Sequence, residues 1–264
     1  DWCNEKIGLI DVLFNNAAIC LYSKSLDAAV KSLRINTFGL YALTKALMLQ
    51  QQLDSSQTGD EYDGKDEHVG HTSVPPPIII NLSSSEGELH YLNSDLASRL
   101  ENISMGNDTE LLQDMLEELL ENFDPDFEYA FGESPFYSVS KAAVNAITRI
   151  LSNSDKHTNR YIINSVCPGD VATDMVTEGQ ESQAKSPETA ANDVLWLALK
   201  PPYSINEDER GNMSNAPSTD GEIIDDDDDD DDDDDTKRTG QRNYMRPRSW
   251  VTGQFWRYKR LAQF

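Results

Sequence analysis

The chain alternates between short apolar runs and longer segments whose apolar residues recur at helical spacing. Residues 9–14, 78–82 and 161–166 are almost continuously apolar, and polar or Pro-Gly residues follow each of them closely. Runs of this length without polar alternation are typical of strands that are buried on both faces. The pattern therefore predicts three strands of a parallel sheet.

Helical segments follow these strands. Residues 26–53, 137–151 and 187–199 carry apolar residues three and four positions apart, which is the spacing of one helix face. Ser186 and Pro187 suit the N-cap and the first position of the last helix. Strands alternating with helices predict an α/β fold, a doubly wound parallel sheet covered on both faces. Ligands bind beyond the carboxyl ends of such strands, so the polar residues there are candidate site residues.

Three polar stretches interrupt this alternation. Residues 54–77 are acidic, residues 86–135 contain one amphipathic stretch, and residues 203–243 include eleven consecutive aspartates at 225–235. Self-repulsion and low hydrophobicity predict that 54–77 and 203–243 are disordered insertions. We expect the chain, residues 1–264, to form a single catalytic domain around them.

Composition narrows the function classes. The net charge is −25, from 22 Lys and Arg against 47 Asp and Glu, and a nucleic-acid reader needs a basic face instead. The three cysteines have no metal-ligand spacing and indicate a reducing, cytoplasmic compartment. No stretch approaches the ~20 apolar residues of a membrane span. The sequence thus predicts a cytoplasmic protein without a metal, a nucleic-acid partner or a membrane anchor.

A Tyr-x-x-x-Lys pattern occurs twice, at Tyr41/Lys45 and at Tyr137/Lys141. Residues four apart share a helix face, so the ammonium lies beside the phenol and can lower its pKa from near 10. Tyr41 lies inside a helix, and its lysine is interpreted as part of a solvated face. Tyr137 opens a helix downstream of a strand that ends in three serines, so this pair is the candidate for acid–base chemistry.

Several motifs in order resemble the short-chain dehydrogenase/reductase family. They are Asn15-Asn16-Ala17-Ala18, Asn36, Asn81 to Gly87, Tyr137-Ser138-Val139-Ser140-Lys141 and Pro168-Gly169. The resemblance covers residues 1 to about 202 and resumes weakly near Gly253. It is closest to the monomeric carbonyl reductases, because Ser84 and Tyr137 are 53 positions apart and an amphipathic helix is expected between them.

The resemblance implies a Rossmann-type fold and four catalytic residues. Tyr137 would protonate the carbonyl oxygen as hydride arrives, and Lys141 would lower the Tyr137 pKa and hold the nicotinamide ribose. Ser84 would bind the carbonyl oxygen, and Asn36 would hold a water that connects Lys141 to solvent. The implied cofactor is NADPH, whose binding residues would be Asn15 and Asn16 on the adenosine side, Val171, Ala172 and Thr173 at the nicotinamide, and Tyr137 and Lys141.

The chain also departs from the family pattern. Ala18 replaces a glycine, and Asp170 stands where carbonyl reductases tend to have an aromatic residue. The glycine-rich turn that holds the pyrophosphate is not found, and residues 9–14 correspond to the family's fourth strand. We therefore expect a domain that is incomplete at its N-terminus, so that this chain alone does not catalyse dinucleotide-dependent reduction until it is extended upstream.

The resulting hypothesis is a monomeric oxidoreductase that reduces a small-molecule ketone, aldehyde or quinone with NADPH. Two alternatives stay open: another short-chain dehydrogenase acting on steroid, retinoid or lipid alcohols, and an inactive relative that serves as a binding module. The complete set Asn36, Ser84, Tyr137 and Lys141 favours catalysis. The missing glycine turn favours its loss.

Overall fold

A computed structural model describes residues 10–58, 76–154, 160–173, 175, 184–199, 252–257 and 260–262. The predicted disordered range 203–243 lies outside the described residues, as does most of the range 54–77. The described residues all belong to one compact unit, formed by residues 1–202 and 251–264.

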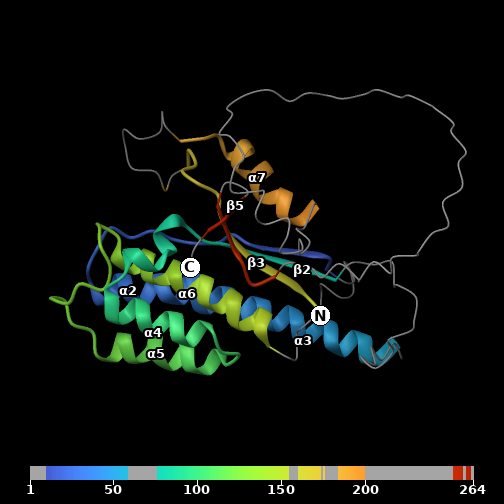
Figure 1. The fold of residues 1–264 in the computed structure, drawn as a ribbon, viewed down its shortest axis with the longest axis horizontal. Helices are drawn as coiled ribbons and strands as arrows, with labels where there is room; N and C mark the ends of the chain where they lie inside the picture. Colours follow the sequence, from blue (N-terminus) through green and yellow to red (C-terminus); the bar gives the residue numbers. More distant parts are fainter. Residues whose placement is uncertain are drawn as a thin grey trace, which may run out of the picture. The chain divides into compact units, whose positions relative to one another are not determined.

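A five-stranded sheet forms the centre of this unit (Figure 1). Its strands are, in spatial order, β1 (Val12–Asn15), β2 (Ile78–Leu82), β3 (Ile162–Cys167), β4 (Phe255–Arg257) and β5 (Arg260–Leu261). The first four are parallel and β5 is antiparallel. The three predicted strands are thus confirmed, and they are adjacent. Strands β4 and β5 were not predicted, because two buried aromatic residues, Phe255 and Trp256, are the only core signal in that short stretch.

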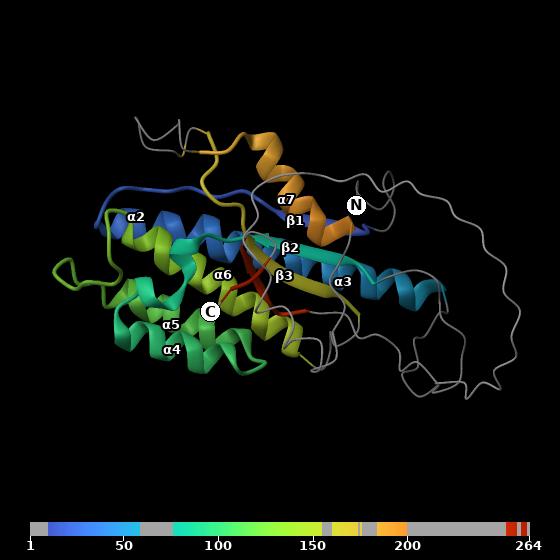
Figure 2. The same ribbon diagram turned by 45° about the horizontal axis from the view of Figure 1, so that its top comes forward.

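Helices cover both faces of the sheet, which confirms the predicted α/β architecture. Helices α2 (Leu26–Ser32), α3 (Leu40–Thr58) and α6 (Pro135–Asn153) lie on one face, and α7 (Pro187–Leu199) lies on the other (Figures 1 and 2). The predicted N-cap of α7 is present, since the Thr189 N–H donates to Ser186 Oγ at 3.2 Å.

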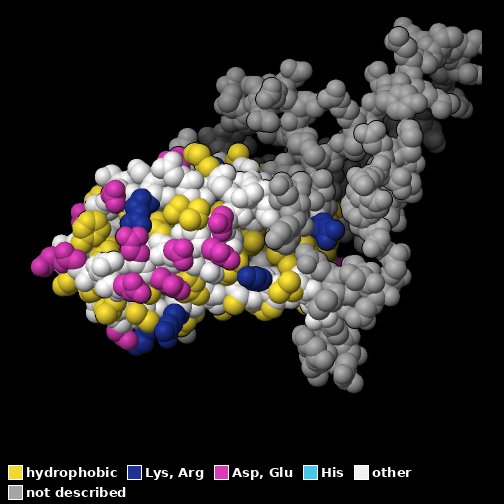
Figure 3. Space-filling model, turned by 90° about the horizontal axis from the view of Figure 1, so that it is seen from below, with side chains coloured by type: hydrophobic (Ala, Val, Ile, Leu, Met, Phe, Trp, Pro, Cys, Tyr) yellow, Lys and Arg dark blue, Asp and Glu magenta, His cyan; other side chains and the backbone are white. Residues whose placement is uncertain are grey.

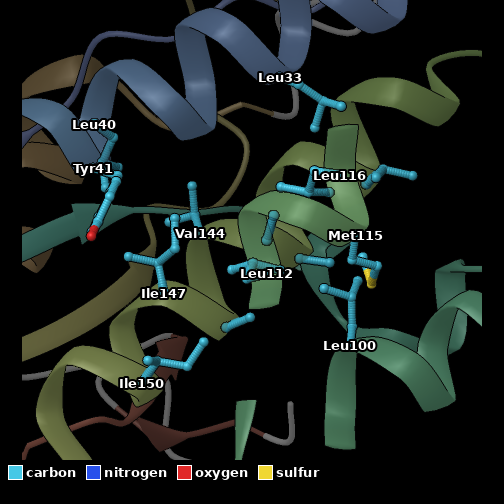
Figure 4. Packing of buried hydrophobic residues seen from close by; sticks show 14 of the residues in the cluster. Leu33, Leu40, Tyr41, Leu100, Leu112, Met115, Leu116, Val144, Ile147 and Ile150 are labelled. Atoms are coloured by element: carbon cyan, nitrogen blue, oxygen red, sulfur yellow. The ribbon is translucent and has the colours of Figure 1, made fainter. Parts of the chain in front are cut away.

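The segment between β2 and α6 contains two helices rather than the single one predicted. They are α4 (Ser94–Ser104) and α5 (Thr109–Glu121), and two short 3₁₀ turns, η2 (Ser85–Gly87) and η3 (Leu89–Tyr91), precede them. Helix α4 was missed because its buried positions, Leu96, Leu100 and Ser104, give too narrow an apolar stripe. Leu112, Met115 and Leu116 of α5 pack with Leu100 of α4 against Val144 and Ile147 of α6 (Figure 4). The insert thereby becomes part of the main hydrophobic core.

The helical region predicted over residues 26–53 is longer and less regular than expected. A π-helical segment, η1 (Leu33–Gly39), joins α2 to α3, and α3 continues to Thr58. Residues 54–58 are therefore helical instead of belonging to the predicted loop. A π-helical turn widens the helix by one residue and is frequently found at functional sites. Here the widened stretch includes Asn36.

Two asparagines at matching positions of β1 and β2 form a buried amide ladder. Asn15 pairs with Asn81 in the register of the two strands, and Asn15 Nδ2 donates to Asn81 Oδ1 at 2.8 Å and to Thr44 Oγ1 at 2.9 Å. Asn81 Nδ2 in turn donates to Thr148 Oγ1 of α6 at 2.9 Å. The ladder thus joins both strands to the helices beneath them.

The surface agrees with the acidic composition. On the face drawn in Figure 3, acidic side chains are spread among uncharged and apolar ones. Within the described part of the chain, every helix falls short of the length and apolar character needed to cross a membrane.

Candidate active site

Ser84 and Tyr137 meet at the carboxyl edge of the sheet. Strand β2 ends at Leu82, and Ser84 follows as the N-cap of η2, where its Oγ accepts from the Glu86 N–H at 3.2 Å. Tyr137 lies in the first turn of α6, which Pro135 starts. The Ser84 side chain lies close enough to the Tyr137 hydroxyl to lower the pKa of that phenol. The chain therefore brings the two residues into contact although 53 positions separate them.

Lys141 lies one helical turn beyond Tyr137. Its Nζ is 5.6 Å from the centroid of the Tyr137 ring and donates to the Leu82 carbonyl oxygen at 2.7 Å. The side chain is buried, being 3% exposed. The ammonium is thus fixed between the end of β2 and the phenol.

Burial controls the proton affinity of both groups. It raises the pKa of Tyr137 well above its ordinary value, and the nearby Ser84 side chain opposes this only in part. It also lowers the pKa of Lys141 to about 8. The pKa of Tyr137 is therefore raised and not lowered as expected, because desolvation is the largest influence on the phenol. At neutral pH the phenol keeps its proton.

Close packing between η2 and α6 positions these groups. A Cβ placed on Gly87 would lie 2.8 Å from the Lys141 carbonyl carbon, which leaves no room for a side chain. Ser83 Oγ donates to the Lys141 carbonyl oxygen at 3.2 Å, and Asn145 Nδ2 donates to the Gly87 carbonyl oxygen at 3.1 Å. The segment Ser83 to Gly87, called the serine turn below, is therefore hydrogen-bonded to α6 at both of its ends.

Asn36 links three elements. Its side chain exchanges two hydrogen bonds of 2.8 Å with the backbone of Ile19, and its Nδ2 also donates to Ser140 Oγ at 2.9 Å. Ser140 lies on α6 between Tyr137 and Lys141. Both amide hydrogens of Asn36 are thus used within the protein, so the side chain holds α6 against the loop after β1 and offers no N–H to a water.

The five remaining predicted cofactor residues lie at the carboxyl end of β1 and after β3. The Asn15 side chain is buried in the amide ladder, and its Oδ1 has no hydrogen-bond partner among the described residues. Asn16 is exposed. Val171 to Thr173 lie beyond the carboxyl end of β3, where Thr173 Oγ1 donates to the Val171 carbonyl oxygen at 3.4 Å.

Two site residues were not found from the sequence. Burial raises the pKa of the Cys20 thiol, so it keeps its proton at neutral pH. Glu86 accepts hydrogen bonds from the first turn of α6. Glu86 was noted only as part of the motif Asn81 to Gly87, and no local pattern indicates the role of either residue, since their partners come from distant segments. In the described ranges, no three His, Cys, Asp or Glu side chains gather in a way that could hold a metal ion.

The second Tyr-x-x-x-Lys pair has a different environment. Tyr41 is buried in the core, its hydroxyl is 2.8 Å from Thr109 Oγ1 on α5, and Lys45 is exposed. Lys45 thus lies on a solvated face, as the sequence interpretation had it, while Tyr41 packs between helices.

Stability should depend on pH through Lys141. Its folded-state pKa of about 8 lies below the ordinary 10.5, so between these values the unfolded chain binds more protons and stability rises with pH. We expect the free energy of unfolding, measured with urea, to increase from pH 8 towards pH 9.5. Lys141→Met should remove this increase, whereas Lys45→Met, on an exposed lysine, should keep it. If the free energy of unfolding depended on pH equally in the two variants, the lowered pKa of the buried Lys141 ammonium would be refuted.

No family model matches the chain, but curated proteins and solved structures do. Salutaridine reductase from Papaver bracteatum is 32% identical over 66% of this chain and 61% of its own length. Short-chain dehydrogenase/reductase 1 from Saponaria officinalis is 28% identical over 66% and 59%. Human carbonyl reductase [NADPH] 3 is 26% identical over 76% and 67%. The chain thus spans about three fifths of the length of the first two.

Solved structures agree on the fold. Salutaridine reductase from Papaver somniferum superposes with a TM-score of 0.58 at 24% identity, covering 76% of this chain and 72% of that one. Menthone neomenthol reductase from Mentha piperita gives 0.52 at 22% identity, covering 76% and 69%. By sequence the chain is thus similar to short-chain dehydrogenase/reductases and carbonyl reductases, and its fold is that of the solved reductases.

Proposed function

We propose that the protein containing this chain reduces a carbonyl group of a small molecule to an alcohol, with Tyr137 as the proton donor. The observation that carries the proposal is the contact of the Ser84 and Tyr137 hydroxyls beside the Lys141 ammonium. A carbonyl oxygen placed between the two hydroxyls would accept from both. Ser84 would stabilise the charge that develops on the oxygen, and Tyr137 would transfer its proton.

A proton donor must be protonated at the working pH, and the raised pKa of Tyr137 meets this need.

NADPH is the proposed hydride source, and the donors at the site fit its nicotinamide end. The Lys141 ammonium and the Tyr137 hydroxyl suit the ribose hydroxyls, and residues 171–173 lie at the same edge of the sheet for the carboxamide. On the proposed adenosine side, the exposed Asn16 offers its amide, whereas the Asn15 side chain is buried in the amide ladder. When bound, the cofactor supplies a hydride. The choice of NADPH over NADH rests on the resemblance to relatives such as the carbonyl reductases.

Isotope transfer tests the proposal directly. The full protein that carries this chain should transfer deuterium from C4-deuterated NADPH to the carbinol carbon of the alcohol formed from an aromatic aldehyde or a cyclic ketone. Mass spectrometry of the product measures the label, and NADH in place of NADPH tests the cofactor preference. Glu101→Gln, on an exposed side chain of α4, is the matched control and should transfer label as the unchanged protein does.

The alternatives give different results. Oxidation of a steroid or retinoid alcohol with NADP⁺, without label transfer to any carbonyl, would favour a dehydrogenase of that class. NADPH binding without turnover of any substrate would favour an inactive binding module. Either result would contradict the proposed reaction.

A further inference from the structure

Glu86 connects the serine turn to the start of the tyrosine helix. Its backbone N–H donates to Ser84 Oγ at 3.2 Å. Its carboxylate Oε2 accepts from Ser138 Oγ at 2.9 Å and from Ser134 Oγ at 3.2 Å. One residue thus touches both elements whose side chains meet in the Ser84–Tyr137 contact.

The hydrogen bonds at the start of α6 explain why this carboxylate is placed there. Ser134 is the N-cap residue, yet its side chain makes no capping bond to the helix and donates to Glu86 instead. Free N–H groups give a helix N-terminus a partial positive charge, which a carboxylate stabilises. Glu86 therefore supplies, from another segment, the negative charge that a capping side chain would ordinarily bring.

The two serines lie on either side of Tyr137 in the sequence. Because both donate to the same carboxylate oxygen, the turn that carries the phenol cannot rotate without breaking one of these bonds. Within the described residues, no Lys or Arg forms an ion pair with Glu86. Its carboxylate is thus engaged by these hydroxyls and not by a surface cation.

We propose that Glu86 is a positioning residue. By hydrogen-bonding the turn that carries Ser84 to the start of α6, which carries Tyr137, it sets the separation of the Ser84 and Tyr137 hydroxyls. The proposal rests on the function proposed above. A second consequence follows from the charge: Glu86 adds to the burial that raises the pKa of Tyr137, and so helps the phenol to keep its proton.

Two substitutions separate geometry from charge. Glu86→Ala removes the acceptor, so kcat should fall at least about tenfold with KM changed less than about threefold, because reacting groups misplaced by ~1 Å lose up to about 10²-fold in rate. Glu86→Gln keeps an acceptor oxygen but removes the charge. Its kcat at neutral pH should stay within about threefold of the unchanged protein, while the alkaline limb of its pH–rate profile moves to lower pH.

A third variant covers the case in which Glu86→Ala does not fold. The double variant Ser134→Ala/Ser138→Ala removes the two hydroxyls that donate to Glu86, and it should lose as much kcat as Glu86→Ala. Adding Glu86→Ala to the double variant should cause little further loss of kcat, as expected for groups that act together. Glu101→Gln is the control carboxylate variant. Near-normal kcat and an unmoved pH profile in both Glu86 variants would overturn the proposal, as would equal kcat losses in Glu86→Ala and Glu86→Gln.

The outcome also separates this inference from the proposed function. If Tyr137→Phe is inactive while the Glu86 variants behave as the unchanged protein, only the role of Glu86 is refuted. If Tyr137→Phe keeps its activity, the proton donor itself has been misassigned.

Discussion

Tyr137→Phe should lower kcat/KM for carbonyl reduction by about 10²–10⁴-fold, the range expected when a general acid is removed. The phenylalanine ring fills the same space, so the half-buried site keeps its packing. The loss should appear mainly in kcat, because the hydroxyl acts on the oxygen in the transition state. Steady-state kinetics with a small quinone or aromatic aldehyde, together with a urea unfolding curve, would measure both effects.

Tyr41→Phe is the matched control for this experiment. Tyr41 belongs to the other Tyr-x-x-x-Lys pair, and its hydroxyl contacts only Thr109 on α5 among the described residues. Its loss should cost about 1 kcal/mol of unfolding free energy, the usual net worth of such a bond, and leave kcat unchanged. Activity retained by Tyr137→Phe, or lost equally by both variants, would refute the assignment of the proton donor.

Gly87→Ala should impair both stability and turnover. The new Cβ would lie 2.8 Å from the Lys141 carbonyl carbon and 2.9 Å from its oxygen. Because both are backbone atoms, η2 and α6 would have to separate. Overpacking of this kind costs about 1–3 kcal/mol of unfolding free energy, and the separation of Ser84 from Tyr137 should lower kcat by up to about 10²-fold.

Gly132→Ala distinguishes this packing effect from ordinary destabilisation. Gly132 has a φ of 95°, and a Cβ there would meet no atom within 4 Å. Its replacement should cost a similar 1–3 kcal/mol through backbone strain, on the order expected for unfavourable dihedral angles, but should leave kcat near normal. If Gly87→Ala also kept its kcat, close approach of η2 to α6 would not be what positions the site.

The features that the sequence predicted well are those with local signals. Three short, largely apolar runs placed β1, β2 and β3, and the parallel sheet then required residues after their carboxyl ends to meet. The contact of Ser84 with Tyr137 follows from this topology, even across an insertion of two helices. The N-cap at Ser186 is equally local, since its signal is a serine directly before a proline.

The features that were missed depend on distant partners or on small changes in helix geometry. A π-helical turn keeps the same apolar residues as an α-helix, so spacing alone could not reveal η1. Nothing near Glu86 in the chain indicates that hydroxyls from Ser134 and Ser138 will reach it. The pKa of Tyr137 was predicted in the wrong direction, because the sequence showed the neighbouring lysine but not the depth of burial.

The amide ladder between β1 and β2 bears on how the strands find their partners during folding. Three consecutive isoleucines in β2 could face the apolar residues of β1 in several alignments of nearly equal hydrophobic burial, since both strands are covered on both faces. Only the alignment that sets Asn15 opposite Asn81 lets Asn15 Nδ2 donate to Asn81 Oδ1. Any shifted pairing would leave buried polar groups without partners, at about 1–3 kcal/mol each. Two asparagines thus select one alignment from several, and the end of β2, from which Ser84 follows, is placed correctly as a result.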